Sequence, residues 1–235
     1  MQKKIALFVE GQTEMIFLSE MVNQVFGEKK VKIVVHKIQG TYNKIIINKF
    51  ETDIAKEYFF LLYNCGTDER VKSTIKDNYQ KLQQANFIHI IGLQDLFNPQ
   101  RKKKGLDDKK FQETINADIP QAIPAKIYFA IQEIEAWFIA EETHYQRISS
   151  TLSMEKVNTI ARIDVQKEDT EIIPHPTIIL NEIYKAGGRK KGYSKNEFVI
   201  KDVVGKLDFS NLYLIVRKRN NSLNEFLTCL DGLIP

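Results

Sequence analysis

The strongest constraint on the fold is an uninterrupted apolar run near the start of the chain. Residues 5–9 contain no polar side chain, and Glu10 and Gly11 follow directly. A strand without polar alternation is typical of a parallel sheet that is buried on both faces. Apolar residues then recur at helical spacing over residues 13–26. This order predicts a strand, a turn and a crossover helix.

The same alternation continues through the first 145 residues. Strands separated by helices imply right-handed crossovers and a mainly parallel sheet with helices on both faces. The predicted fold class is therefore α/β. Further strands are predicted at residues 31–38, 58–63, 87–93 and 126–131, and helices at residues 45–55, 67–84 and 133–140.

The pattern changes after about residue 145. Shorter, mostly helical segments are expected at residues 154–161, 177–184, 196–204 and 221–230, and Pro174-His175-Pro176 and Gly187-Gly188 separate them. We therefore expect a core over residues 1–145 and a mostly helical C-terminal region over residues 146–235.

Composition excludes several classes of protein. With 43% hydrophobic residues, 14 Phe and 9 Tyr, the chain is not expected to be disordered. No apolar run approaches the roughly 18–20 residues that span a bilayer, so neither a membrane anchor nor a signal peptide is expected. Two cysteines, Cys65 and Cys229, are too few for a disulfide framework or a four-cysteine zinc site. A cytoplasmic protein is the expectation.

The formal net charge of +4 is small, but the charges are unevenly arranged. Basic residues cluster at 101–104, 189–191 and 217–219, whereas Glu133, Glu135, Glu141 and Glu142 form an acidic group. Basic tracks around an acidic centre suit a polyanion that is held for metal-dependent chemistry. Each cluster taken alone is better explained as an ordinary solvated loop.

Two carboxylates follow predicted strands. Glu10 ends the first strand and Asp95 ends the strand at residues 87–93. Ligands of open parallel sheets bind at the carboxyl ends of the strands, and Mg²⁺ prefers hard oxygen ligands. Glu14 lies one helical turn after Glu10, although an acid in the first turn is also favoured by the helix dipole.

Several segments in order resemble a known family. They are Val9-Glu10-Gly11-Gln12-Thr13-Glu14, residues 90–99 (IIGLQDLFNP), residues 134–140 (IEAWFIA), His175-Pro176, Tyr193-Ser194-Lys195 and residues 221–226 (NSLNEF). Together they resemble a small bacterial Toprim-like family, similar in fold to the overcoming-lysogenization-defect nucleases. The resemblance extends over nearly the whole chain.

The resemblance implies a Toprim-like endonuclease that hydrolyses phosphodiesters with Mg²⁺ or Mn²⁺. The implied catalytic residues are Glu10, Asp95 and Lys195, and the implied metal ligands are Glu10, Glu14, Asp95 and Glu135. The usual Asp-x-Asp is here Leu93-Gln94-Asp95, which leaves open whether one or two metals bind. Glu135 is our replacement ligand, ranked above Glu133 because two residues apart on a helix point in different directions.

The resemblance also implies partners. Members of this family are commonly encoded beside an AAA/ABC-type ATPase in anti-phage defence loci, and any ATP hydrolysis must come from that partner because this sequence has no P-loop. A DNA or RNA substrate, including tRNA, and a homo-oligomer or hetero-oligomer all stay open. The expected phosphate contacts are Arg101, Lys102, Lys103, Arg189, Lys190, Lys191 and Arg217.

Two other functions remain open from the sequence. A catalytically silent Toprim-like subunit could bind and regulate the ATPase, since only one aspartate of the metal motif is present. A flavodoxin-like protein that binds a small molecule would leave Glu10 and Asp95 as coincidental strand-end residues. Metal binding discriminates the first of these from the nuclease, and the basic clusters count against the second.

Overall fold

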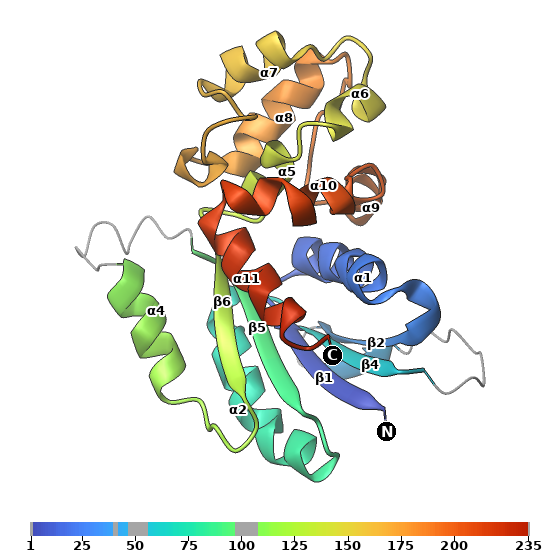
Figure 1. Ribbon diagram of the computed structural model, residues 1–235, viewed down its shortest axis with the longest axis vertical. Coiled ribbons are helices and arrows are strands. Elements are labelled where there is room, and N and C mark those ends of the chain that lie inside the picture. Colours follow the sequence, from blue (N-terminus) through green and yellow to red (C-terminus); the bar gives the residue numbers. More distant parts are fainter. Residues whose placement is uncertain (1, 40–41, 47–55, 97–107, 235) are drawn as a thin grey trace. The chain divides into compact units, whose positions relative to one another are not determined.

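The computed structural model describes residues 2–39, 42–46, 56–96 and 108–234 (Figure 1). The chain forms two compact units, one of Met1–Gln94 with Asn98–Phe129 and the other of Asp95–Phe97 with Ala130–Pro235. The division thus falls earlier than the residue 145 expected from the sequence. The reason is that the backbone N–H of Ile131 and the Trp137 indole both donate to the Ser222 hydroxyl, which ties this segment to the C-terminal helices.

The first unit is built on a six-stranded sheet with the order β3-β2-β4-β1-β5-β6. The strands β1, β2, β4 and β5 pair in parallel, and β3 pairs antiparallel with β2 at one edge. The predicted α/β class with a mainly parallel sheet is confirmed. The strands are β1 (Lys3–Val9), β2 (Val31–Gln39), β3 (Tyr42–Ile46), β4 (Tyr58–Asn64), β5 (His89–Leu96) and β6 (Ala125–Ile131).

Helices cover both faces of this sheet. The crossover from β1 to β2 passes through α1 (Gln12–Phe26), and the crossover from β4 to β5 passes in the opposite direction along the sheet through α2 (Asp68–Gln84). Because crossovers between parallel strands are almost always right-handed, two crossovers in opposite directions place their helices on opposite faces of the sheet (Figure 1). A short 3₁₀ helix (Glu28–Lys30) precedes β2, and α4 (Asp108–Ala117) precedes β6.

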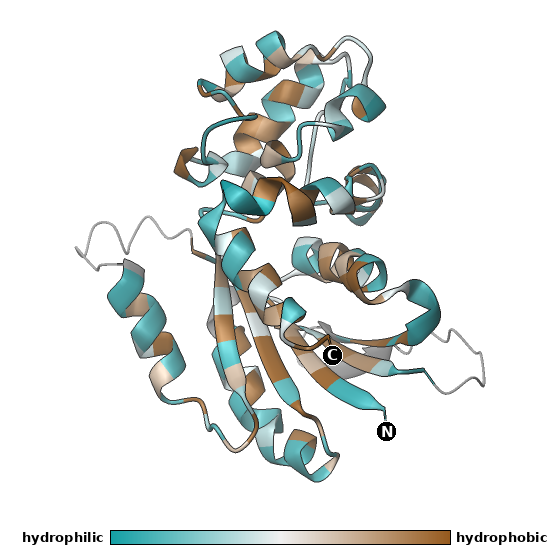
Figure 2. Ribbon diagram, viewed as in Figure 1, coloured by the Kyte–Doolittle hydropathy of each residue, from teal (hydrophilic) through white to brown (hydrophobic). Residues whose placement is uncertain are grey.

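The central strand β1 forms the middle of the core. Its residues Ile5 to Val9 are each at most 1% exposed, as a strand covered on both faces requires. The rings of Phe8 and Tyr63 stack at 4.5 Å between centroids and join β1 to β4. In Figure 2 the middle of β1 and β5 is mostly hydrophobic, whereas α4 alternates between hydrophobic and hydrophilic residues.

One predicted helix is wrong at its start, and three helices of the structure were not predicted. The helix expected at residues 45–55 is wrong at its start, because Ile45 and Ile46 belong to β3, where Ile46 pairs with Val35. The rest of that segment from residue 47 lies outside the described residues. The helix α4 was not expected, and neither were α6 (His144–Ile148) and α10 (Phe209–Leu214), which are too short to show a helical period.

The second unit is mostly helical, as expected. Its centre is α5 (Glu135–Ala140), in which all six residues are buried. No helix in the described part of the chain is long and apolar enough to cross a membrane. The remaining helices are α7 (Met154–Ala161), α8 (Pro176–Ala186), α9 (Glu197–Val204) and α11 (Asn221–Asp231), with 3₁₀ helices at Thr170–Ile172 and Val216–Lys218.

A buried carboxylate, Glu141, connects three helices of this unit. It is 0% exposed at the end of α5. Its Oε1 accepts from the Thr143 N–H at 3.0 Å and from Asn211 Nδ2 at 2.9 Å, and its Oε2 accepts from the Asp208 N–H at 3.1 Å. The Arg147 guanidinium adds an ion pair at 3.3 Å. Glu141 therefore holds the start of α6 and the start of α10 in place.

Replacing Glu141 with Gln is expected to destabilise the protein by about 3 kcal/mol at neutral pH, because an amide NH₂ would face donors. Burial alone would raise the pKa of Glu141, but hydrogen bonds from His144 and Thr143, the His144 charge and the Asn211 hydrogen bond lower it to about 2. The lowered pKa means that the stabilisation is present above the ordinary value of 4.5 and is lost as the pH falls towards 2.

Urea unfolding of Glu141→Gln and wild type between pH 3 and pH 7 measures this difference. The difference in the free energy of unfolding between the two proteins should narrow as the pH falls below 4.5. The control variant Glu155→Gln, which changes an exposed residue, should match wild type at every pH. An equal gap at every pH would contradict the assignment.

Gly92 on β5 allows the sheet to pack closely. A Cβ atom at this position would lie 2.7 Å from Cγ1 of Ile127 and 3.2 Å from Cγ1 of Val71. Gly92→Ala is therefore expected to lower the free energy of unfolding by about 2 kcal/mol. Gly232→Ala is the matched control, since its Cβ would make an ordinary 3.5 Å contact with the Cys229 carbonyl. Equal urea midpoints for the two variants would refute this reading.

Candidate metal centre

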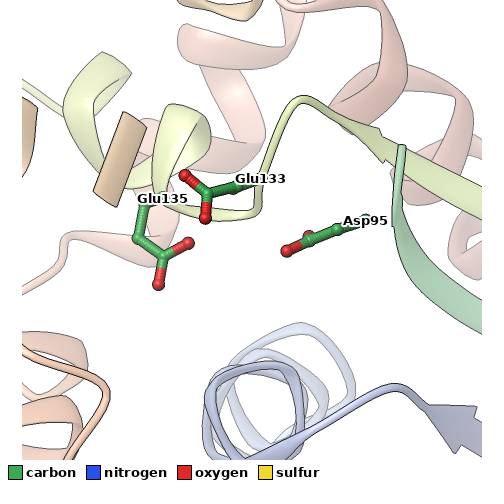
Figure 3. Close-up of side chains that lie close together, drawn as sticks. All are labelled: Asp95, Glu133 and Glu135. Carbon is green, nitrogen blue, oxygen red and sulfur yellow. The ribbon is translucent and has the colours of Figure 1, made fainter. Parts of the chain in front are cut away.

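Three carboxylates converge in the second unit. Asp95, Glu133 and Glu135 each place one carboxylate oxygen within 4.8 Å of the others, and Figure 3 shows these groups pointing toward one another. Asp95 lies near the end of β5, Glu133 lies in the turn after β6, and Glu135 is the first residue of α5. The cluster thus joins a strand end, a turn and a helix start.

Backbone groups fix the two less buried carboxylates. The N–H of Ile134 donates to Oδ1 of Asp95 at 2.9 Å, and the N–H of Thr177 donates to Oε2 of Glu133 at 2.9 Å. Two non-glycine residues beside these donors adopt left-handed backbone conformations, Gln132 with φ 65° and His175 with φ 55°. Such conformations are costly and are maintained only where the surroundings enforce them. The turn is therefore built to present Glu133 to the cluster.

The ranking of Glu135 above Glu133 rested on a helix that contains both residues, and this premise is wrong. The helix α5 begins at Glu135, and Glu133 lies in the preceding turn. The angular separation expected on a helix does not apply there, so both side chains reach the same place. Two of the four expected metal ligands, Asp95 and Glu135, belong to the cluster, and Glu133 is added to them.

Glu135 is the most deeply buried member, with 0% exposure. Its Oε1 accepts a hydrogen bond from the Tyr193 hydroxyl at 2.8 Å, while its buried Oε2 accepts no hydrogen bond but pairs with Lys195 Nζ at 3.3 Å. Burial raises the pKa of Glu135, and the charge of Glu133 adds to that rise, whereas Lys195 and the Tyr193 hydrogen bond oppose it. The site therefore holds a carboxylate that gains from any additional positive charge.

Lys195 supplies the positive charge that the three carboxylates share. Its Nζ lies 3.3 Å from Glu135, 3.5 Å from Glu133 and 3.8 Å from Asp95. The prediction that Lys195 belongs to the site is consistent with this position. One ammonium group against three carboxylates leaves a negative excess when all are ionised.

The loop after α8 delivers both Tyr193 and Lys195. Gly192 has φ 56°, and a Cβ there would lie 2.0 Å from Oδ1 of Asn181. That same Oδ1 accepts from the N–H of Tyr193 at 3.1 Å, so the loop is fastened to α8 just before it enters the site. Sequence reasoning missed Tyr193 as a partner of Glu135, although Tyr193-Ser194-Lys195 was among the segments that carry the family resemblance.

The donor set fits a divalent cation. Carboxylate oxygens are the ligands that Mg²⁺ and Mn²⁺ prefer. Among the described residues, five buried side-chain atoms lack a hydrogen-bond partner, and three of them are Oε2 of Glu135, Oε1 of Gln132 and Oγ1 of Thr177. Gln132 precedes Glu133, and Thr177 contacts Glu133 through its N–H. Of these atoms, Oε2 of Glu135 belongs to the cluster itself, where it pairs with Lys195 Nζ at 3.3 Å and would also be a ligand for a cation.

Glu10 and Glu14 lie in the first unit. The N–H of Glu10 donates to the Leu93 carbonyl at 3.2 Å, which extends the pairing of β1 with β5 by one residue. Oε2 of Glu14, a buried residue, accepts from the Gly11 N–H at 2.9 Å and caps α1. Capping accounts for the position of Glu14 without a metal, and the metal-binding roles of both residues stay predictions.

The expected phosphate contacts fall into three groups. Arg101, Lys102 and Lys103 lie outside the described residues. Arg189 pairs with Asp202 at 2.9 Å, while Lys190 and Lys191 beside it are exposed. Arg217 donates to Asn224, Asp231 and Thr228, so packing against α11 already explains its position.

Fold and cluster together define an α/β protein with a three-carboxylate candidate metal centre in its second unit. A family model described as "Domain of unknown function (DUF4276)" matches residues 9–212, and the chain belongs to this family. The matched region includes the three carboxylates, Tyr193 and Lys195. No curated protein and no solved structure matches the chain.

A divalent cation that binds here should stabilise the fold. At a concentration about 100 times its dissociation constant, Mn²⁺ is expected to contribute about 2.7 kcal/mol and to raise Tm by about 5 °C or more. Asp95→Asn should abolish this rise, because it removes a charged ligand while its side-chain oxygen still accepts from Ile134. Differential scanning fluorimetry in Mn²⁺, Mg²⁺ and EDTA measures it.

The matched control is Glu182→Gln, which neutralises an exposed carboxylate on α8 of the same unit. It should keep the full Mn²⁺-dependent rise. An equal rise in Asp95→Asn would place cation binding elsewhere.

Proposed function

We propose that this protein is a Mg²⁺- or Mn²⁺-dependent nuclease of the Toprim type. The observation that carries the proposal is the convergence of Asp95, Glu133 and Glu135 on one lysine, whose single charge is set against three carboxylates. Carboxylates that can hold a divalent cation, together with a cationic side chain, suit phosphodiester hydrolysis, because both positive groups stabilise the charge that develops on the phosphoryl oxygens. When bound, the divalent cation supplies Lewis-acid stabilisation of the charge that develops on the phosphoryl oxygens.

The roles of the chain's own residues follow from their positions. Asp95, Glu133 and Glu135 would hold the cation, and their backbone hydrogen bonds keep two of them oriented. Lys195 would exchange its carboxylate partners for a non-bridging phosphate oxygen, where an ammonium group stabilises added negative charge. Tyr193 would keep Glu135 oriented through its hydrogen bond. Glu10 enters the proposal through the Toprim resemblance, as the group that positions or deprotonates the attacking water.

The topology of the sheet supports this location. The crossovers through α1 and α2 leave the sheet on opposite faces, so a topological switch point lies at the carboxyl end of β1. Ligands of open parallel sheets bind outside the strands at such points. Glu10 directly follows β1, and the neighbouring strand β5 carries Asp95 near its end.

The biological setting is part of the proposal and rests on the family resemblance. We infer a cytoplasmic effector of an anti-phage defence system that acts with an AAA/ABC-type ATPase, since the chain has no P-loop of its own. The helical second unit offers the surface on which such a partner could dock.

The direct test incubates the purified protein, alone and with the ATPase encoded beside its gene, with plasmid DNA, single-stranded DNA and total tRNA in Mn²⁺ or Mg²⁺. Wild type should cut at least one substrate, and EDTA should stop the cleavage. Asp95→Asn and Glu135→Gln should each slow cleavage about 100-fold or more, because each removes a ligand charge. Glu182→Gln should cut at the wild-type rate.

A specific observation favours the second candidate function, a catalytically silent subunit of the ATPase complex. Lys195 already pairs with all three carboxylates, so the cluster has a compensating charge without a metal. If wild type leaves every substrate intact with and without the ATPase, the nuclease proposal fails. Co-purification of the ATPase with wild type and Asp95→Asn alike would then support the silent subunit.

A further inference from the structure

The segment that delivers Lys195 to the carboxylates carries an unusual share of the basic charge. Residues 185–206 contain seven basic and two acidic residues, an excess of five, whereas the whole chain has a net charge of +4. Lys190 and Lys191 are both exposed, and no ion-pair partner for either occurs among the described residues. Arg189 is held against Asp202 and the ring of Tyr184.

An aromatic side chain lies beside these cations. Phe198, in the first turn of α9, is 78% exposed and is the most exposed large hydrophobic residue in the described part of the chain. Its neighbour Ile200 is fully buried, so α9 is anchored by another face. Phe198 therefore contributes little to packing, although leaving its apolar ring in contact with water is unfavourable.

The cations and the aromatic ring line one hollow of about 560 Å³, together with Ser194 and Asn196. Its volume lies within the range of ligand-binding sites. Ammonium groups bind phosphates, and an exposed ring is a platform on which a base can stack. The combination is typical of surfaces that bind single-stranded nucleic acid, because the bases of a duplex are already stacked on each other.

We propose that the surface formed by Arg189, Lys190, Lys191, Ser194 and Phe198 binds single-stranded nucleic acid, with Phe198 stacking on a base and the two lysines contacting phosphates. This inference rests on the proposed nuclease function and names its substrate class. The same loop carries Lys195 only three residues before Phe198. A strand held on this surface is therefore bound by the loop that also contributes the cation of the carboxylate cluster.

A protein partner is the competing occupant, and the charge argues against it. The centres of protein interfaces are depleted in lysine. Here two exposed lysines and a third cation line the same hollow as the aromatic ring, which suits a polyanion.

Binding is measured by fluorescence anisotropy in EDTA, so that cleavage plays no part. The probes are fluorescein-labelled oligo(dT), oligo(U) and a blunt DNA duplex of equal length. Wild type should bind one or both single strands more tightly than the duplex. Phe198→Ala should weaken single-strand binding about tenfold, and Phe198→Trp should restore it, because stacking requires only an aromatic face.

The charge contribution is tested by the salt dependence. Lys190→Gln with Lys191→Gln should reduce the slope of log affinity against log salt by about 1.4, which corresponds to two lost phosphate contacts. Lys109→Gln with Lys110→Gln on α4 removes the same charge from exposed positions elsewhere and should leave the slope unchanged. Ile178→Ala, which truncates a 53% exposed apolar residue on α8, is the control for Phe198→Ala.

The outcomes separate this inference from the proposed function. Equal binding by wild type and Phe198→Ala, or a duplex bound as tightly as the single strands, overturns the single-strand surface even if the protein cuts nucleic acid. Loss of ATPase co-purification in Phe198→Ala with unchanged oligonucleotide binding assigns the surface to a protein partner and also overturns it. Single-strand binding that depends on Phe198 supports it even where no cleavage occurs.

Discussion

The second unit depends on one electrostatic balance, in which Lys195 offsets three carboxylates that lie within 4.8 Å of one another. Like charges this close repel, and the burial of Glu135 removes the water that would screen them. The ammonium group reduces this repulsion but cannot cancel it, since it carries one charge against three. Burial is the main reason why the pKa of Glu135 stays raised, and the charge of Glu133 adds to the rise. The remaining negative excess would make a second cation favourable at the same place.

The carboxylates are brought together at a conformational cost. Left-handed backbone at Gln132 and at His175 is unfavourable by about 1–3 kcal/mol for each residue. Neither residue is the glycine that would adopt this conformation without strain. Both flank a hydrogen bond that orients the cluster, from Ile134 to Asp95 and from Thr177 to Glu133. Backbone strain and repulsion between like charges both lower the stability of the fold. Residues that maintain both at one place are expected to serve binding rather than stability.

The sequence predicted the regular parts of the fold well, because buried strands and crossover helices leave strong periodic patterns. It predicted Asp95, Glu135 and Lys195 for the site, partly from strand-end position and partly from the family resemblance. The side chain of Glu133 was expected to point away from that of Glu135, because the predicted helix began two residues before the true start of α5. Tyr193 was missed as the partner of Glu135 because the contact spans 58 residues of sequence, and no local pattern reports it.

The loop between α8 and α9 connects the two charged features of the second unit. Its attachment to α8 leaves little freedom, since Gly192 packs so closely on Asn181 that no other residue fits there without displacement. Tyr193 and Lys195 extend from this loop to the carboxylates, while Lys190 and Lys191 stay exposed on it. A shift of the loop would therefore change the charge balance of the cluster and the arrangement of the exposed cations together.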